Sequence, residues 1–296
     1  MRRVFFSAAG LRSCWRALLF AIAVFAAYTA LTLPWGDSLE AHRGELWADI
    51  AGSFIFVCAT LLATWVMARF IDRKPFTAFG LSTSGMSGRA TIGVVVGFGA
   101  LSLLLVMLWL LHCFSFGGPV LSGAAALRFG LMHAMWFTMV ALTEELSTRG
   151  YLLFVITQGI GFWPAALLLS ALFAAGHLYN SGEDWIGIAA AFALGVVLAW
   201  SVRRTGSLWW AIGFHAGWDW GESYFYGVPD SGRVAQGHLL GGTLRGPGWL
   251  SGGSVGPEGS ALIFLVIALL AVVVRWFPKT PPEGLERIRV EARNGG

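Results

Sequence analysis

Long apolar runs separated by short polar connections fill most of this chain. A run of about 20 residues is long enough to cross the hydrocarbon of a bilayer as a helix. The pattern predicts spans near residues 15–34, 48–68, 90–112, 129–148, 162–178, 187–202, 207–225 and 260–277. We therefore predict an all-α fold, a polytopic membrane helix bundle with about eight transmembrane helices.

The composition agrees with a lipid environment. Of the 296 residues, 56% are hydrophobic and 12% are charged, and the mean hydropathy is +0.69. A soluble globule with a wet surface cannot be built from this balance. We expect a single membrane domain over residues 1–296, surrounded by membrane lipid. Residues 227–259 are rich in glycine and are interpreted as an external loop without chemistry, and residues 278–296 as a cytoplasmic tail.

Basic residues are distributed unevenly between the connections, which predicts the orientation of the bundle. Placing both termini in the cytoplasm puts most arginines and lysines on the inside. The inside set is Arg2, Arg3, Arg12, Arg16, Arg69, Arg73, Lys74, Arg89, Arg149, Arg203, Arg204, Arg275 and Lys279. The outside set is Arg43, Arg128, Arg233 and Arg245. Because the basic residues are scattered between apolar segments, we predict no nucleic-acid partner. The short loops and the arginine-rich inside segments look bacterial, so we expect an integral protein of a bacterial inner membrane.

Ionisable residues inside the spans carry the functional information, because a charged side chain at a helix centre in lipid costs about 2.5–3.5 kcal/mol. Two adjacent carboxylates, Glu144 and Glu145, precede Arg149 near the end of the fourth span. On a helix, Glu145 and Arg149 share a face and can form an ion pair. Glu144 is turned about 100° away and could address a different surface.

Two further clusters place imidazoles in the spans. His177 ends an apolar span among small residues that permit close helix approach. His215 lies one helical turn before Asp219, so an imidazole and a carboxylate share one face of the seventh span. With the first cluster, these residues supply one free carboxylate, two imidazoles and a second acid.

Other polar residues have simpler interpretations. Four histidines without patterned partners are left out of the predicted site: His42, His112, His133 and His238. Four acids lie near the predicted external ends of the spans and are expected to be solvated: Glu183, Asp184, Glu222 and Asp230.

The three clusters match, in order, the motifs EExxxR, FxxxH and HxxxN/D, here Glu144–Arg149, Phe173–His177 and His215–Asp219. In this the chain resembles the CAAX prenyl endopeptidase and bacteriocin-processing (CPBP, or Abi) intramembrane proteases. The stretch 195–209, which contains RRTGSLW, also looks like the family's connection into the third motif. The resemblance covers about residues 125–225, the expected CPBP-like catalytic core. The chain departs from the family at Ser147 and Thr148, usually an apolar pair, and at Asp219, where most members carry asparagine.

The resemblance implies an intramembrane endopeptidase, similar to type II CAAX prenyl endopeptidases, that cleaves a peptide or membrane-protein substrate. Glu144 is then the expected base, with His177 holding or polarising the same water. His215 would donate to the oxyanion or the leaving group, and Asp219 would orient His215 or bind the water. Glu145 and Arg149 would fix the helix end.

Metal dependence and the substrate stay open at this point. Glu144, His177, His215 and Asp219 could ligate zinc or another divalent metal with one position left open. There is no HExxH motif, so a glutamate-activated water without a tightly bound metal is favoured, and no cofactor is assigned. Prenylated tails and leader peptides are both candidate substrates.

Two other functional classes remain as alternatives. Membrane-embedded glutamate, histidine and arginine also build the proton relays of transporters, although no inverted repeat is evident. A non-catalytic scaffold or immunity protein could keep the same fold. Because Glu144 lies near Arg149, and His215 about two turns after Arg203–Arg204, we expect the site to open toward the cytoplasmic half. His177 fits that depth less easily, unless residues 150–161 are re-entrant.

Overall fold

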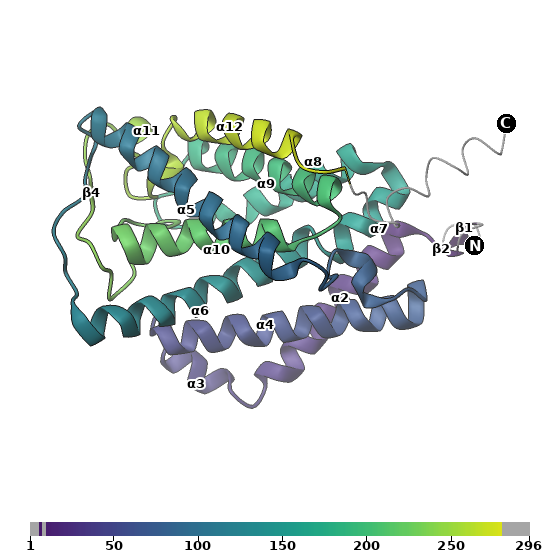
Figure 1. The fold of residues 1–296 in the computed structure, drawn as a ribbon. Coiled ribbons are helices and arrows are strands. Elements are labelled where there is room, and N and C mark those ends of the chain that lie inside the picture. Colours follow the sequence, from purple (N-terminus) through teal and green to yellow (C-terminus); the bar gives the residue numbers. More distant parts are fainter. Residues whose placement is uncertain (1–5, 8–9, 280–296) are drawn as a thin grey trace.

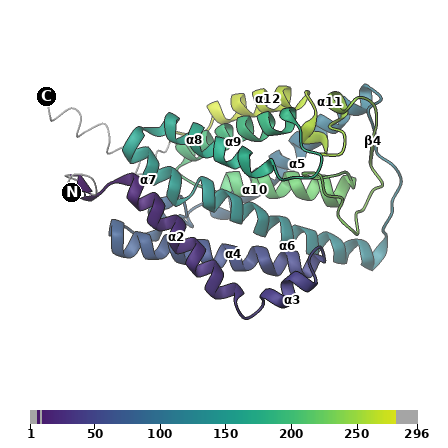
Figure 2. The same cartoon turned by 180° about the vertical axis from the view of Figure 1, so that it is seen from behind.

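The computed structural model describes residues 6–7 and 10–279, and it shows a bundle of helices that run in alternating directions (Figures 1 and 2). The predicted tail, residues 278–296, lies mostly outside the described residues, and Arg2 and Arg3 lie outside them. The helices are α2 (Ser13–Thr32), α3 (Gly36–Ala41), α4 (Leu46–Val66), α5 (Met86–Leu110), α6 (Gly123–Thr148), α7 (Tyr151–Ile160), α8 (Phe162–His177), α9 (Trp185–Thr205), α10 (Trp209–Asp219), α11 (Gly248–Ser251) and α12 (Ile263–Arg275).

Shorter elements complete the chain. The π-helical segments η1 (Met67–Asp72) and η3 (Trp220–Tyr226) continue α4 and α10, and single turns of 3-10 helix form η2 (Phe76–Phe79) and η4 (Pro257–Gly259). Two antiparallel pairs of two-residue strands join β1 (Phe6–Ser7) to β2 (Gly10–Leu11) and β3 (Phe114–Ser115) to β4 (Thr243–Leu244). These strands only tie loops together, so the predicted all-α class is confirmed.

The helices have the length and surface of a membrane bundle. In the described part of the chain, five helical segments are long and apolar enough to cross a bilayer, namely α2, α4 with η1, α5, α6 with α7, and α9. Large apolar side chains such as Phe25 and Leu131 point away from the bundle with most of their surface exposed, as expected where lipid replaces water. α8 and α12 are apolar but shorter, with 16 and 13 residues, so the count of eight spans is not confirmed.

The segment between the fourth and fifth predicted spans is a helix of its own. α6 stops at Gly150, where a Cβ atom would lie 2.4 Å from the Leu146 carbonyl oxygen, and α7 follows at once. Gly161, with a φ of +85°, then ends α7, and Pro164 lies in the first turn of α8, where its missing N–H costs nothing. α7 therefore packs against α8 and α2 as a short helix between two spans.

α10 is the central helix of the bundle and carries the third motif. Its two sides belong to two different cores, one shared with α2, α4, α7 and α8, the other with α5, α9 and α12. Glycines bring it very close to α5: a Cβ atom on Gly97 or Gly213 would lie 2.0 or 2.1 Å from a carbonyl oxygen of the facing helix. Small residues permit this backbone contact in membranes, and it places His215 at a fixed depth and rotation.

A polar network closes the end of the bundle that the charge pattern predicts to be cytoplasmic. The Arg16 guanidinium forms an ion pair with Asp72 and donates to Gln158 at 2.8 Å. The Tyr151 hydroxyl donates to the other Asp72 oxygen at 2.6 Å. The strands β1 and β2 and the helix α7 lie at this end, and the loop with β4 lies at the opposite end (Figure 1). The first span is thus bound into the bundle through α4 and α7.

Candidate active site

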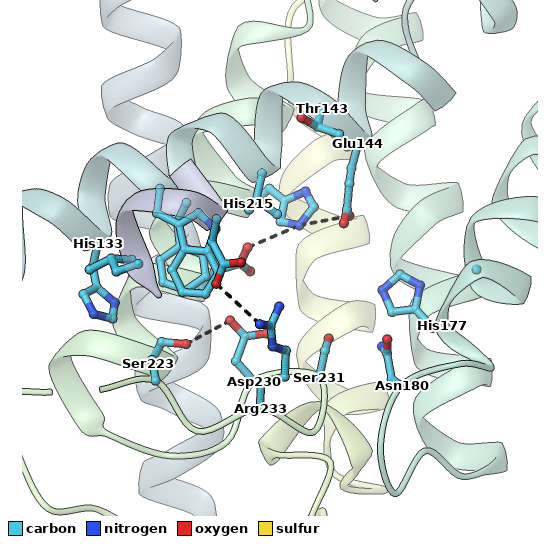
Figure 3. A pocket seen from close by; sticks show the side chains of 18 of the residues that line it. His133, Thr143, Glu144, His177, Asn180, His215, Ser223, Asp230, Ser231 and Arg233 are labelled. Carbon is cyan, nitrogen blue, oxygen red and sulfur yellow. Dashed lines mark hydrogen bonds and ion pairs between the residues drawn. The ribbon is translucent and has the colours of Figure 1, made fainter. Parts of the chain in front are cut away.

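A cavity of about 640 Å³ brings the three motifs together. It lies between α4, α6, α8 and α10 and is covered in part by residues of the external loop, 227–259. Its lining includes Glu144, His177 and His215 (Figure 3). Asp219 also lines it, so four of the six predicted site residues do. The other two, Glu145 and Arg149, lie behind this wall with side chains that are 0% and 2% exposed.

Glu145 holds the first and third motifs together. One of its oxygens, Oε1, accepts a hydrogen bond from Arg149 at 2.8 Å and lies 3.1 Å from Nδ1 of His215. The ion pair with Arg149 is the one expected from the helical spacing, but the contact with α10 joins residues 70 positions apart. Glu145 therefore does more than fix a helix end, because it also orients the His215 ring.

Arg149 connects the first motif to the second. Its guanidinium carbon lies 4.4 Å from the centre of the Phe173 ring, a cation–π contact. Nδ1 of His177 lies 2.9 Å from the Phe173 carbonyl oxygen, which can only accept, so Nδ1 carries the proton and Nε2 has a free lone pair. Phe173, the phenylalanine of FxxxH, therefore contacts Arg149 through its ring and His177 through its carbonyl oxygen. A Cβ atom on Gly195 of α9 would lie 2.9 Å from the guanidinium, which explains the small residue there.

Two carboxylates approach the second nitrogen of His215. Nε2 lies 3.5 Å from Glu144 Oε2 and 3.5 Å from Asp219 Oδ2. The Glu144 side chain is 33% exposed whereas that of Glu145 is buried, so the free and the structural carboxylate separate as the helical geometry predicts. Figure 3 shows the Glu144 carboxylate and the His177 ring facing the same part of the cavity. Asp219 is paired with His215 and is therefore no isolated charge.

The residues that replace the family's apolar pair are satisfied locally. Ser147 and Thr148 donate their hydroxyl protons to the carbonyl oxygens four residues earlier, at 2.6 and 2.5 Å. Such bonds neutralise a hydroxyl within a membrane helix. The departure from the motif therefore leaves the geometry around Glu144 intact.

The expectation that the site opens toward the cytoplasmic half stays a prediction, because the fold alone does not determine which end of the bundle faces the cytoplasm. Beyond the helices, the cavity is lined by Gly44, Asn180 and residues 230–236, all at the end opposite to Arg149 and Arg203. These lining residues come from the connection between α3 and α4, from the segment after α8 and from the external loop. His177 lies at that far end of α8, so its depth is consistent with the cavity.

The interpretation of the external loop and of two acids also needs correction. The loop supplies Asp230, Ser231 and Arg233 to the cavity wall, and Glu222 is completely buried. Asp184 caps α9 by accepting from the amides of Ile186 and Gly187. No sequence signal marks the roles of the loop residues, because glycine-rich segments have no periodicity from which contacts could be deduced. The cap by Asp184 does have one, since an aspartate directly before an apolar helix is a common N-cap.

One omitted histidine also lines the cavity. His133 is fully buried on α6 and its Nε2 lies 3.0 Å from the Gln236 carbonyl oxygen, among the aromatic rings of Trp136, Phe137 and Tyr224. It joins α6 to the external loop, which agrees with a structural role.

The four predicted donors do not gather around one point in this conformation. Among the described residues, the only group of three or more acidic, histidine or cysteine side chains with ligand atoms within 4.8 Å of one another consists of Glu222, Asp230 and Glu258. Glu144, His177, His215 and Asp219 form no such group, so we derive no step through a metal held by them. The metal-free scheme stays a prediction for experiment, with zinc as its alternative.

Comparison with known proteins agrees with the motifs. Residues 126–221 match the family model described as type II CAAX prenyl endopeptidase Rce1-like, over about a third of the chain. No curated protein and no solved structure matched. The matched segment runs from α6 through α10 into η3, and it contains all three motifs and every residue that joins them. Over this core, which contains all three motifs, the chain is similar to the Rce1-like type II CAAX prenyl endopeptidases.

Proposed function

We propose that this protein is an intramembrane endopeptidase in which Glu144 activates a water molecule for attack on a peptide bond. The observation that carries the proposal is the convergence of Glu144, His177 and His215 on one cavity from three separate helices. A scaffold would not need a carboxylate that lies 3.5 Å from one imidazole and lines the same cavity as a second within a membrane bundle. The family match supports the reaction class.

In the first step, Glu144 takes a proton from water and the resulting hydroxide attacks the carbonyl carbon of the substrate. His177 fits the role of holding this water, because its Nδ1 proton is used by the Phe173 carbonyl and its Nε2 can accept from the water. The carbonyl oxygen becomes an oxyanion, and His215, when its Nε2 carries a proton, donates to it. Glu145 and Asp219 position that imidazole.

In the second step, the bond between carbon and nitrogen breaks. The proton that Glu144 accepted passes to the leaving amine, and the carboxylate is regenerated. No cofactor is consumed, and the products are a carboxylic acid and an amine. Glu145 and Arg149 touch no reacting atom in this scheme and act as positioning residues.

The shape of the cavity favours a peptide that is bound along α6. The lining extends from Phe129 to Thr148 on this helix, close to the whole length of a span. Phe56 of α4 and Leu172 of α8 border its side, and Leu172 is 60% exposed at the surface that would face lipid. We infer that a membrane-associated peptide segment is the substrate class, and both leader-type and lipid-modified segments remain to be tested.

The test is cleavage of quenched fluorescent membrane peptides by the full-length protein in detergent. We expect Glu144→Gln to lower the cleavage rate by at least about 100-fold, because general acid–base catalysis contributes about 10²–10⁴-fold. The matched control is Glu40→Gln, which removes an exposed carboxylate that is 68% exposed and lies outside the cavity. A zinc-selective chelator should leave the wild-type rate unchanged.

Three outcomes would overturn parts of the proposal. Full activity in Glu144→Gln would refute the assignment of the base. Loss of activity with the chelator, restored by zinc, would replace the metal-free scheme. The scaffold alternative replaces the protease if two results occur together. The wild type cleaves neither leader-type nor prenylated peptides, and Glu144→Gln and His177→Gln chains still restore whatever growth or processing defect deletion of the protein causes in cells.

A further inference from the structure

A second cluster of acids lies beside the proposed active site. Glu222 in η3, Asp230 in the external loop and Glu258 in η4 come from three consecutive parts of the chain, and we call them the acidic triad. One carboxylate oxygen from each lies within 4.8 Å of the other two. A small cavity of about 80 Å³ is lined by all three acids and also by His177 and His215.

No ion pair among the described residues neutralises the acidic triad, although His215 lines the same small cavity. Arg233, three residues after Asp230, pairs with Asp49 instead. Three carboxylates gathered this closely repel one another, and a bound cation would offset that repulsion.

Glu222 is the observation that points to a ligand. It is 0% exposed, and neither of its carboxylate oxygens has a hydrogen-bond partner among the described residues. Oε2 of Glu258 is also buried and without a partner. A buried carboxylate without a donor is strongly disfavoured, since nothing replaces the water it loses. Another carboxylate cannot supply that donor unless it is protonated.

The backbone is arranged to hold the remaining oxygens in place. The Ser231 amide donates to Glu258 Oε1 at 2.5 Å, and the Ser223 hydroxyl donates to Asp230 Oδ2 at 3.0 Å. Gly256 has a φ of +130°, and a Cβ atom there would lie 2.8 Å from Glu222 Oε1, 2.5 Å from Glu258 Oε2 and 2.2 Å from the Pro229 carbonyl oxygen. Glycine at position 256 therefore leaves space at the point where these oxygens converge.

We propose that the acidic triad binds a Ca²⁺ ion that fastens the external loop to the end of η3. The donors are all oxygens, which excludes a preference for zinc or copper. Ca²⁺ takes six to eight oxygens at about 2.3–2.6 Å in flexible geometry, so two of its ligands lie up to about 5 Å apart. Mg²⁺ demands a tighter octahedron and keeps several waters, which suits this buried site less well.

The site has a structural consequence for the cavity. Asp230 and the residues that follow it form part of the wall of the proposed active site. An ion shared by the acidic triad would fix this wall relative to α10, which continues directly into η3. The proposal does not depend on the protease reaction, and its test uses no substrate.

The test measures thermal unfolding of the full-length protein in detergent, after treatment with EGTA and desalting, as CaCl₂ is added at constant ionic strength. We expect a saturable rise in Tm of about 5 °C, the size given by ligand at about 100 times its Kd. Radioactive ⁴⁵Ca²⁺ should bind at about one ion per chain. Glu222→Gln and Glu258→Gln should abolish both signals, and Glu40→Gln, which removes an exposed acid, should keep them.

Asp230→Asn is the second variant, chosen because it removes one charge from a partly exposed position and is expected to fold. It should weaken ⁴⁵Ca²⁺ binding at least tenfold. The absence of both a Tm rise and bound ⁴⁵Ca²⁺ in the wild type would overturn the proposal, and so would equal binding by the triad variants. A Tm rise with MgCl₂ or MnCl₂ but not with CaCl₂ would refute the choice of ion.

Discussion

Removing Arg149 should destabilise the protein more than any exposed ion pair could, because its partner Glu145 is buried in the bundle. The two side chains are 2% and 0% exposed, and their charged atoms lie 2.8 Å apart. At an effective dielectric constant of about 20, Coulomb's law gives about 6 kcal/mol of attraction at this distance. Desolvation offsets much of that, but removal of one partner still costs about 3–5 kcal/mol, since the other charge stays buried.

The assay is a double-mutant cycle on Tm in detergent with Arg149→Met, Glu145→Gln and both changes together. Each single variant should lower Tm by roughly 6–20 °C, from about 2–4 °C per kcal/mol. The double variant should lose much less than the sum, because no unpaired charge remains. Arg43→Met is the control, since it removes an ion pair whose side chains are 75% and 68% exposed, and it should change Tm little.

Two results would refute this reasoning. If Arg149→Met unfolds within about 2 °C of the wild type, the pair is not stabilising in the way that its burial implies. If the losses of the single variants simply add in the double variant, the two charges do not interact, and the contact seen in the structure has no energetic meaning.

Three further predictions concern packing, the third motif and topology. Gly97→Ala should lower Tm markedly because its Cβ atom would lie 2.0 Å from a carbonyl oxygen of α10, whereas Gly99→Ala, with nothing within 4 Å, should not; equal shifts would contradict the glycine contact. Asp219→Asn keeps an oxygen for the neighbouring histidine and adds an N–H donor, so peptide cleavage should proceed at the wild-type rate or faster, and a tenfold fall would show that the carboxylate charge is required. In a chain without native cysteines, a membrane-impermeant thiol reagent applied to intact cells should label Val234→Cys but not Ser84→Cys, and labelling of both from outside would disprove the orientation.

Much of the fold could be predicted from periodicity, because a helix in lipid must satisfy its own backbone and present apolar side chains. The predicted span at 15–34 is α2, Ser13–Thr32, and the span at 90–112 is α5, Met86–Leu110. The number of membrane crossings was harder to predict from the sequence. α12 has only 13 residues, and the length of an apolar run does not say whether its helix crosses the bilayer.

Contacts within one helix also followed from the sequence. Glu145 and Arg149 lie four residues apart, so their pairing needs only helical geometry, and the outward turn of Glu144 has the same origin. The motif order and the family resemblance depend on these local patterns as well. The sequence by itself therefore determined the membrane class, the candidate residues and the side of each helix on which they lie.

Only the tertiary structure decided which of these faces meet. The contact of Glu145 with His215 depends on the depth of α10, which the glycines it shares with α5 set through backbone contact. The cavity depends on α4, α6, α8 and α10 meeting residues of the external loop, and the acidic triad depends on that glycine-rich loop folding back onto η3. Such contacts join residues far apart along the chain, and because they arise from the packing of many side chains at once, no periodicity in the sequence records them.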